Sequence, residues 1–173
     1  KRIIFLNIYL HIEILVRELD SNLLLACLAA KRGHQVFISN LSDLDTGLKM
    51  GLISPGVFHT KSLTPNNKKI DKHQTLKDKG FAITSIDQEA NLSDYGYDRF
   101  AKTRYSKKSI DQVSAVFCWG LEDTESIKKM YPQFSSKIFM TGSPRVDLWR
   151  PTFRDYWNKS EKLSQKPFLL ISS

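Results

Sequence analysis

Two carboxylates stand close together in residues 16–21, between an apolar N-terminal run and a helical pattern over residues 22–32. In an open parallel sheet, the loop after the first strand commonly lines the crevice in which ligands bind. Carboxylates in that loop are suited to proton transfer. Glu18, which lies outside the predicted helix, and Asp20 are therefore the first candidates for chemistry. An alternative for Asp20 and Ser21 is a capping role, since either side chain can accept hydrogen bonds from first-turn amides.

A second acidic segment follows the predicted strand 81–86. Asp87 and Glu89 there occupy the same topological position as the first acidic segment, so both segments are expected to face one cleft. The two acidic segments together suggest a polar site at one edge of the sheet. Arg17 offers a fork of donors that suits an acidic sugar or a phosphate. The alternative for Arg17 is an ion pair with a carboxylate of its own segment.

Two further motifs end predicted strands. Gly120 follows strand 115–119 and keeps the backbone approachable to a ligand, although a tight turn into the next helix would also select glycine. In residues 142–151, glycine and proline set a sharp exit from the sheet that presents Arg145 and Asp147 together. These two side chains are candidates for ligand binding, or they pair with each other as a structural clip.

The elements that must position these residues alternate along the chain. Short apolar runs alternate with helical patterns, which is typical of a parallel sheet. Strands are predicted over residues 2–6, 35–39, 56–59, 81–86, 115–119 and 137–141, and helices over 22–32, 41–50, 66–79 and 122–130. Cys27 and Cys118 fall within apolar segments and are expected to be reduced, buried thiols.

Size and charge narrow the function classes. A chain of 173 residues suits one ordinary domain. No stretch reaches the roughly 20 apolar residues of a membrane span, and we expect a cytoplasmic protein. The net charge of +8 is concentrated in residues 61–112, around the lysine-rich helix 66–79. A solvated helix face is the simplest interpretation, and binding to phosphates, an anionic membrane or nucleic acid is the alternative.

Neither a glycine-rich phosphate loop nor metal-ligand spacing is present, so no cofactor and no metal are predicted.

The last residues indicate how the chain is organised. Residues 1–150 are predicted to form one Rossmann-like, three-layer α/β/α domain with a mostly parallel sheet. Residues 151–166 are expected to be a linker. Residues 167–173 resemble the first strand of a second α/β domain, because a buried parallel strand needs a crossover helix after it. We therefore expect this chain to be the N-terminal part of a longer protein.

Four ordered motifs resemble the bacterial surface carbohydrate biosynthesis proteins. They lie at residues 16–26, 85–89, 119–123 and 141–147. That family looks like a GT-B glycosyltransferase group, similar in plan to polymer glycerophosphotransferases and Kdo transferases. Two departures from its pattern are Gln88, where an acidic residue is usual, and a long segment between Asn7 and Leu15.

The resemblance implies a two-domain enzyme with its active site between Rossmann-like halves. This chain would be the half that holds a glycan or lipid-linked acceptor, and the missing half would hold a nucleotide-sugar donor. An inverting transfer needs a general base, for which Glu18 is the first candidate and Asp20 the second. The remaining candidates would bind substrate: Arg17, Ser21, Asp87, Glu89, Gly120, Arg145 and Asp147. Peripheral contact with an anionic membrane is expected, and nucleic acid is not. The alternative function is a noncatalytic module that docks on anionic membrane or nucleic acid through the basic region.

Overall fold

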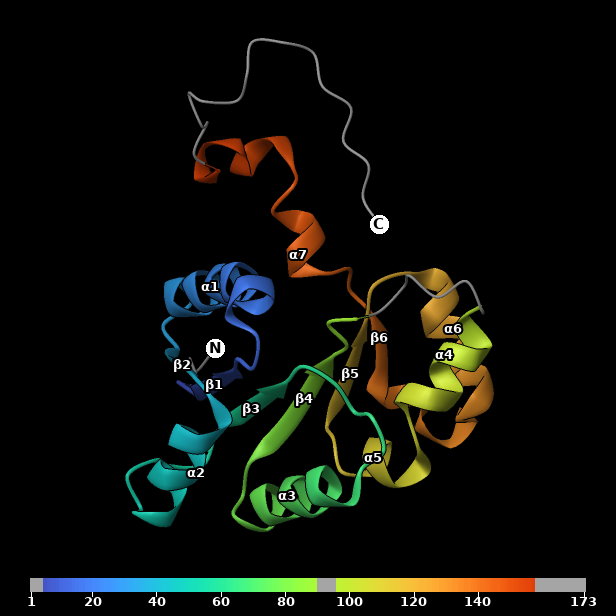
Figure 1. Ribbon diagram of the computed structural model, residues 1–173, viewed down its shortest axis with the longest axis horizontal. Coiled ribbons are helices and arrows are strands. Elements are labelled where there is room, and N and C mark those ends of the chain that lie inside the picture. Colours follow the sequence, from blue (N-terminus) through green and yellow to red (C-terminus); the bar gives the residue numbers. More distant parts are fainter. Residues whose placement is uncertain (1–4, 90–95, 158–173) are drawn as a thin grey trace.

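A computed structural model describes residues 5–89 and 96–157 of the chain, whose strands form one parallel six-stranded sheet (Figure 1). The strand order is β2-β1-β3-β4-β5-β6. The strands are β1 (Asn7–His11), β2 (Gln35–Ser39), β3 (Val57–Thr60), β4 (Ala82–Ile86), β5 (Ala115–Cys118) and β6 (Ile138–Met140). The helices are α1 (Leu15–Lys31), α2 (Leu41–Lys49), α3 (Asn67–Asp78), α4 (Tyr97–Arg104), α5 (Lys107–Asp111), α6 (Leu121–Met130) and α7 (Pro144–Asp147), with 3₁₀ turns η1 (Pro132–Lys137) and η2 (Pro151–Tyr156).

The hydrophobic core lies on one face of the sheet. Tyr9 of β1 stacks on Phe37 of β2 with ring centroids 5.0 Å apart, and the alternate strand residues of this face pack against α2 to α6. Representative core side chains are Tyr9, Leu44, Phe58, Leu76, Ile83, Phe100, Val116, Ile127 and Ile138. Helix α1 lies on the other side of the sheet from α2 and α3 (Figure 1). The predicted three-layer α/β fold is confirmed.

Most elements lie where the sequence predicts them. Strands β2 to β6 and helices α2, α3 and α6 begin and end within one residue of the predicted bounds. Each of these elements is a single run of apolar or periodic residues with polar residues or glycine at its ends, which makes its bounds readable from sequence. The predicted strand at 167–173 and linker residues 158–166 lie outside the described residues.

The first strand and helix differ from the prediction. The strand predicted over residues 2–6 is wrong at residues 5 and 6, and β1 begins at Asn7. A parallel strand is buried on both faces, and β1 achieves this with Tyr9 on the core face and Leu10 on the opposite face. Because the residues at both ends of β1 are polar, the strand does not stand out in the sequence as an apolar run. The strand β1 ends at His11, and α1 begins at Leu15, which is seven residues before the predicted start at residue 22.

The buried side of α1 is also not the predicted one. The leucine-rich part of the helix was expected to be buried together with Cys27, yet Cys27 is exposed and α1 buries Glu18, Ser21 and Asn22. The apolar Leu25 instead lines an open apolar cavity between α1 and the sheet. Cys118 of β5 is buried as expected, and burial raises the pKa of its thiol to about 12.

Gly56 lies where β3 passes closest to β1. A Cβ atom at this position would stand 2.2 Å from the carbonyl oxygen of Asn7, which is backbone and has little freedom to move. We expect Gly56→Ala to lower the free energy of unfolding by about 1–3 kcal/mol, the range for forced overpacking. Denaturant titration measures this, with Gly120→Ala as the control because a Cβ there has no atom closer than 3.9 Å. Equal losses in the two variants would contradict the steric argument.

Candidate functional site

Glu18 lies inside the first turns of α1 rather than in a loop, and its side chain is fully buried. One carboxylate oxygen accepts hydrogen bonds from the backbone amides of Glu13 and Ile14 at 2.8 and 3.3 Å. The other accepts from the Arg17 guanidinium at 2.8 Å and lies 3.7 Å from Lys61 Nζ. Burial opposes the charge, but these amides and cations outweigh it and lower the pKa of Glu18 below its usual value.

Through these contacts the Glu18 side chain caps the start of α1. The N-cap residue Ile14 has no side chain able to accept a hydrogen bond, so the Glu18 carboxylate satisfies amides at the helix start instead. The capping role predicted for Asp20 and Ser21 is wrong, because both lie within α1. The Ser21 hydroxyl donates to the Glu18 carbonyl at 3.0 Å, and Asp20 accepts from the Tyr156 hydroxyl at 2.6 Å.

The two acidic segments meet through Arg17, and Arg104 adds further contacts to the second segment. Arg17 contacts Glu18 and also donates to Glu89 at 3.1 Å. Arg104 of α4 donates to both carboxylate oxygens of Asp87, at 2.8 and 2.9 Å, and to Glu89 at 2.9 Å. The ion pair predicted as the alternative role of Arg17 is therefore present. Arg104 was not predicted as a site residue.

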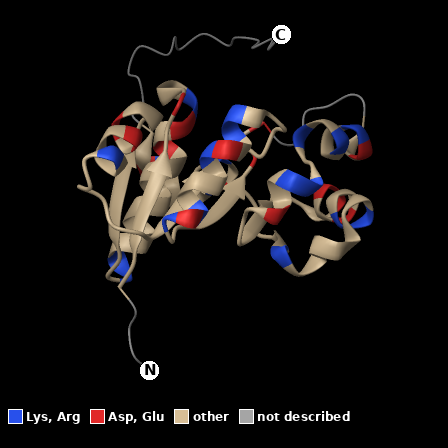
Figure 2. Cartoon of the chain, turned by 90° about the horizontal axis from the view of Figure 1, so that it is seen from below, with Lys and Arg blue, Asp and Glu red and all other residues tan. Residues whose placement is uncertain are grey.

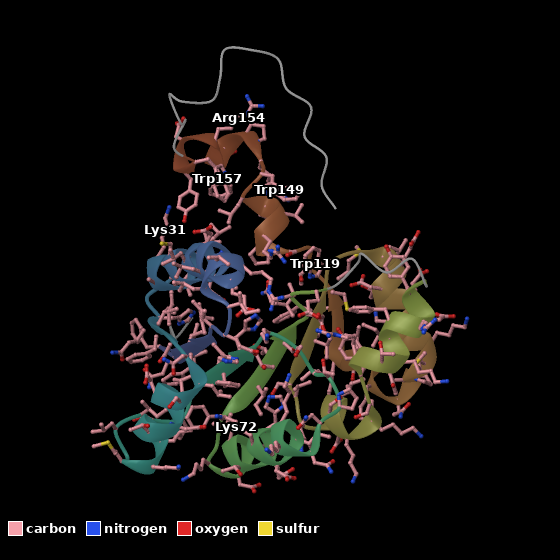
Figure 3. The ribbon with its side chains drawn as sticks, viewed as in Figure 1. Lys31, Lys72, Trp119, Trp149, Arg154 and Trp157 are labelled. Carbon is pink, nitrogen blue, oxygen red and sulfur yellow. The ribbon has the colours of Figure 1, made fainter. Side chains whose placement is uncertain are left out.

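The other two motifs also contact the loop after β4. Trp119 Nε1 donates to the Asp87 carbonyl at 2.8 Å, and Arg145 donates to the Gln88 carbonyl at 2.9 Å. Figure 3 shows Trp119 at the end of β5 beside the end of β4. The clip between Arg145 and Asp147 is wrong, because Asp147 pairs with Arg150 at 2.8 Å. The motifs at residues 16–26, 119–123 and 141–147 thus all contact residues 87–89 of the remaining motif.

Gly120 precedes α6 with a φ of −154°, a conformation open to any residue, so the turn itself does not require glycine. Asp123 accepts hydrogen bonds from the backbone amides of Trp119, Gly120 and Thr124 at 2.9 to 3.0 Å. This is the capping arrangement expected of an acidic residue in a first helical turn. Asp123 is therefore explained by the structure of α6.

A polar cavity of about 510 Å³ opens at the carboxyl ends of β1 and β3, beside the start of α3. We call it the edge cavity. Of the predicted site residues, only Glu89 lines it. Its lining also includes residues not among the predicted site residues, namely His11, Glu13, Lys61, Lys68, Lys69, Lys72, His73 and Arg104. The lysines of α3 are therefore not one solvated face, since Lys68, Lys69 and Lys72 line the cavity and Lys77 does not.

Glu13 is the carboxylate that occupies the loop after β1. Its side chain is 58% exposed, lines the edge cavity, and forms an ion pair with Lys61 at 2.6 Å. The hydrogen bond from Lys61 lowers the pKa of Glu13. The long segment between Asn7 and Leu15 was the sequence signal that could have identified this loop, because it leaves room for both β1 and Glu13.

Three histidines are buried. His11 and His59 lie in strands, and His73 lies in α3. Burial lowers the pKa of His59 to about 4, and burial together with nearby lysines lowers the pKa of His73 to about 4. His59 Nδ1 lies 2.9 Å from Thr84 Oγ1, in the apolar cavity of about 340 Å³ between α1 and the sheet.

Comparison with protein-family models, with curated proteins and with solved structures gives no match for this chain. In the part that the structure describes, no helix has both the length and the apolar composition needed to cross a bilayer. Within residues 5–89 and 96–157, no group of three or more metal-ligating side chains comes together. The site must therefore be interpreted from its own geometry.

Proposed function

We propose that this chain is the acceptor-side domain of a glycosyltransferase-like protein of bacterial surface polysaccharide biosynthesis. The observation that carries the proposal is that the other three resemblance motifs all contact residues 87–89 of the second motif. This convergence lies where a parallel sheet presents its ligand site, at the carboxyl ends of the strands. A glycan or lipid-linked acceptor would bind in the adjacent edge cavity. A second domain would supply the nucleotide-sugar donor, and transfer would take place on the cytoplasmic side of the membrane.

The proposal assigns the general base to Glu13 in place of Glu18. In an inverting transfer, the acceptor oxygen attacks the anomeric carbon, its proton passes to the base, and the nucleotide leaves with the electrons of its bond to the sugar. Glu13 is exposed to the edge cavity, and its carboxylate is held by a single cation. Glu18 is buried and shares its oxygens among two amides and two cations. Of these two carboxylates, Glu13 alone can reach an acceptor hydroxyl without breaking the start of α1.

The noncatalytic alternative, docking on a polyanion through the basic region, has weaker support. A polyanion site needs many cations on one continuous face. In Figure 2, Lys/Arg and Asp/Glu are interspersed over the helices. Lys72 is moreover paired with Asp45 of α2. A cavity with several cations suits a compact anion better than an extended one.

The test is a transfer assay on the protein encoded by the whole reading frame that contains this chain. Nucleotide sugars and lipid-linked glycans are screened for product, and Glu13→Gln is then compared with the exposed-surface control Glu125→Gln. Loss of a general base is expected to reduce turnover by about 10²- to 10⁴-fold, whereas the control retains full turnover. Undiminished turnover by Glu13→Gln would overturn the assignment of the base, and no transfer with any donor would overturn the proposed function.

A further inference from the structure

The edge cavity holds more positive charge than its ion pairs neutralise. Five lysine and arginine side chains line it, against the two carboxylates of Glu13 and Glu89. Three of the five are paired: Lys61 with Glu13, Lys72 with Asp45, and Arg104 with Asp87 and Glu89. The amino end of α3, which carries the partial positive charge of the helix dipole, adds to this potential at the rim.

Lys69 is the central cation without a carboxylate. Its Nζ donates to Ser62 Oγ at 2.7 Å, and no carboxylate of the described residues lies within ion-pair distance of it. Burial and the neighbouring Lys61 lower the pKa of Lys69, so its charge is held at a cost in free energy. An anion beside Lys69 would remove that cost.

Two buried histidines supply an independent indication of a ligand. His11 and His73 line the same cavity, 8% and 2% exposed, with ring centroids 6.2 and 6.3 Å from that of Phe58. In each ring Nδ1 is buried and has no hydrogen-bond partner among the residues that the structure describes. A buried polar atom without a partner is costly and calls for an explanation. A ligand with several acceptor oxygens would provide one.

We propose that the edge cavity binds a phosphate monoester, with Lys69 as its principal cation and His11 and His73 as hydrogen-bond donors. A phosphate monoester carries close to two negative charges near neutral pH and offers three strong acceptor oxygens, which matches one lysine and two imidazoles. The cavity volume of about 510 Å³ lies in the range of small-molecule sites and leaves room for the group esterified to the phosphate. The inference rests on the cavity alone and not on the proposed transferase function.

The test is a nuclear magnetic resonance titration of the chain with inorganic phosphate and then glucose 6-phosphate. Saturable shifts of the His11 and His73 imidazole nitrogens are expected. Lys69→Gln should weaken binding about tenfold or more, since it removes a charge-assisted hydrogen bond. Lys77→Gln, on the same helix but outside the cavity, should leave the affinity unchanged. Absence of saturable imidazole shifts, or equal weakening in both variants, would overturn the proposal.

A second arm identifies the source of the phosphate. Vesicles containing phosphatidic acid are compared with vesicles of phosphatidylcholine in a sedimentation assay. Binding that is lost in Lys69→Gln but kept in Lys77→Gln would place a lipid phosphate in the cavity. Binding that falls equally in the two variants would be surface attraction and would overturn a lipid source. Circular dichroism melting of each variant shows whether it is folded, so that a loss of binding is not mistaken for a loss of structure.

Discussion

Glu18→Ala is expected to lower the free energy of unfolding by about 3–5 kcal/mol, the range for removing one partner of a buried charge pair. The substitution leaves the amides of Glu13 and Ile14 without their acceptor and removes the Glu18 contact from Arg17. It also opens a void in a fully buried position. The start of α1 should therefore fray, and the effect should exceed that of any other single carboxylate in the first turns of the helix.

Urea denaturation followed by circular dichroism measures this loss. Asp20→Ala is the matched control, because Asp20 lies on the same helix and, among the residues that the structure describes, its carboxylate accepts a hydrogen bond only from the Tyr156 hydroxyl. We expect the control to lose less than about 1 kcal/mol. If Glu18→Ala were as stable as the unaltered protein, the capping role would be wrong, and Glu18 would again be a candidate for the general base.

Acidification is expected to destabilise the fold well before its carboxylates are protonated. The pKa values of His59 and His73 are lowered to about 4 in the folded protein, against 6.5 for a free histidine. Below pH 6.5 the unfolded chain therefore binds protons that the folded chain rejects, and the free energy of unfolding falls with falling pH until about pH 4. Each histidine contributes about 3 kcal/mol to this loss, since one pKa unit corresponds to about 1.4 kcal/mol.

A series of urea titrations between pH 7 and pH 4 measures this dependence. Acetate and other phosphate-free buffers are needed, so that anion binding near His73 does not add to the effect. His59→Gln removes one of these two titrations and should make the curve less steep. Stability that stays constant between pH 6.5 and pH 4 would contradict the buried, neutral state of both histidines.

The sequence predicted the fold far better than it predicted the site. Strands such as β2 and β5 are apolar runs with clear ends, so local pattern and tertiary structure agree. Residues 5 and 6 belong to a more apolar run than Asn7–His11, yet they lie outside the strand, in which Tyr9 and Leu10 face opposite sides of the sheet. Glu18 lies in α1 and not in the predicted loop because the helix begins at Leu15 instead of residue 22.

The site could be predicted only where it depends on topology. The meeting of the two acidic segments follows from the rule that parallel strands end at one edge, and Arg17 joins them there. The contact of Arg104 with Asp87 and Glu89 depends on how α4 packs, and no local pattern in its polar segment reveals that. Likewise, the burial of His73 follows from the side of α3 that faces Phe58.

The strand order has a consequence for how the chain is made. After β1 and β2 have paired, β3 joins β1, and β4, β5 and β6 then add one after another to the same growing edge. Each strand can therefore dock as soon as it leaves the ribosome, without waiting for a distant segment. Among the described residues the last strand is β6, which is only three residues long, so this edge of the sheet offers little backbone to a neighbouring molecule. The same strand order thus allows the strands to pair stepwise during synthesis and leaves a short edge strand that protects against aggregation.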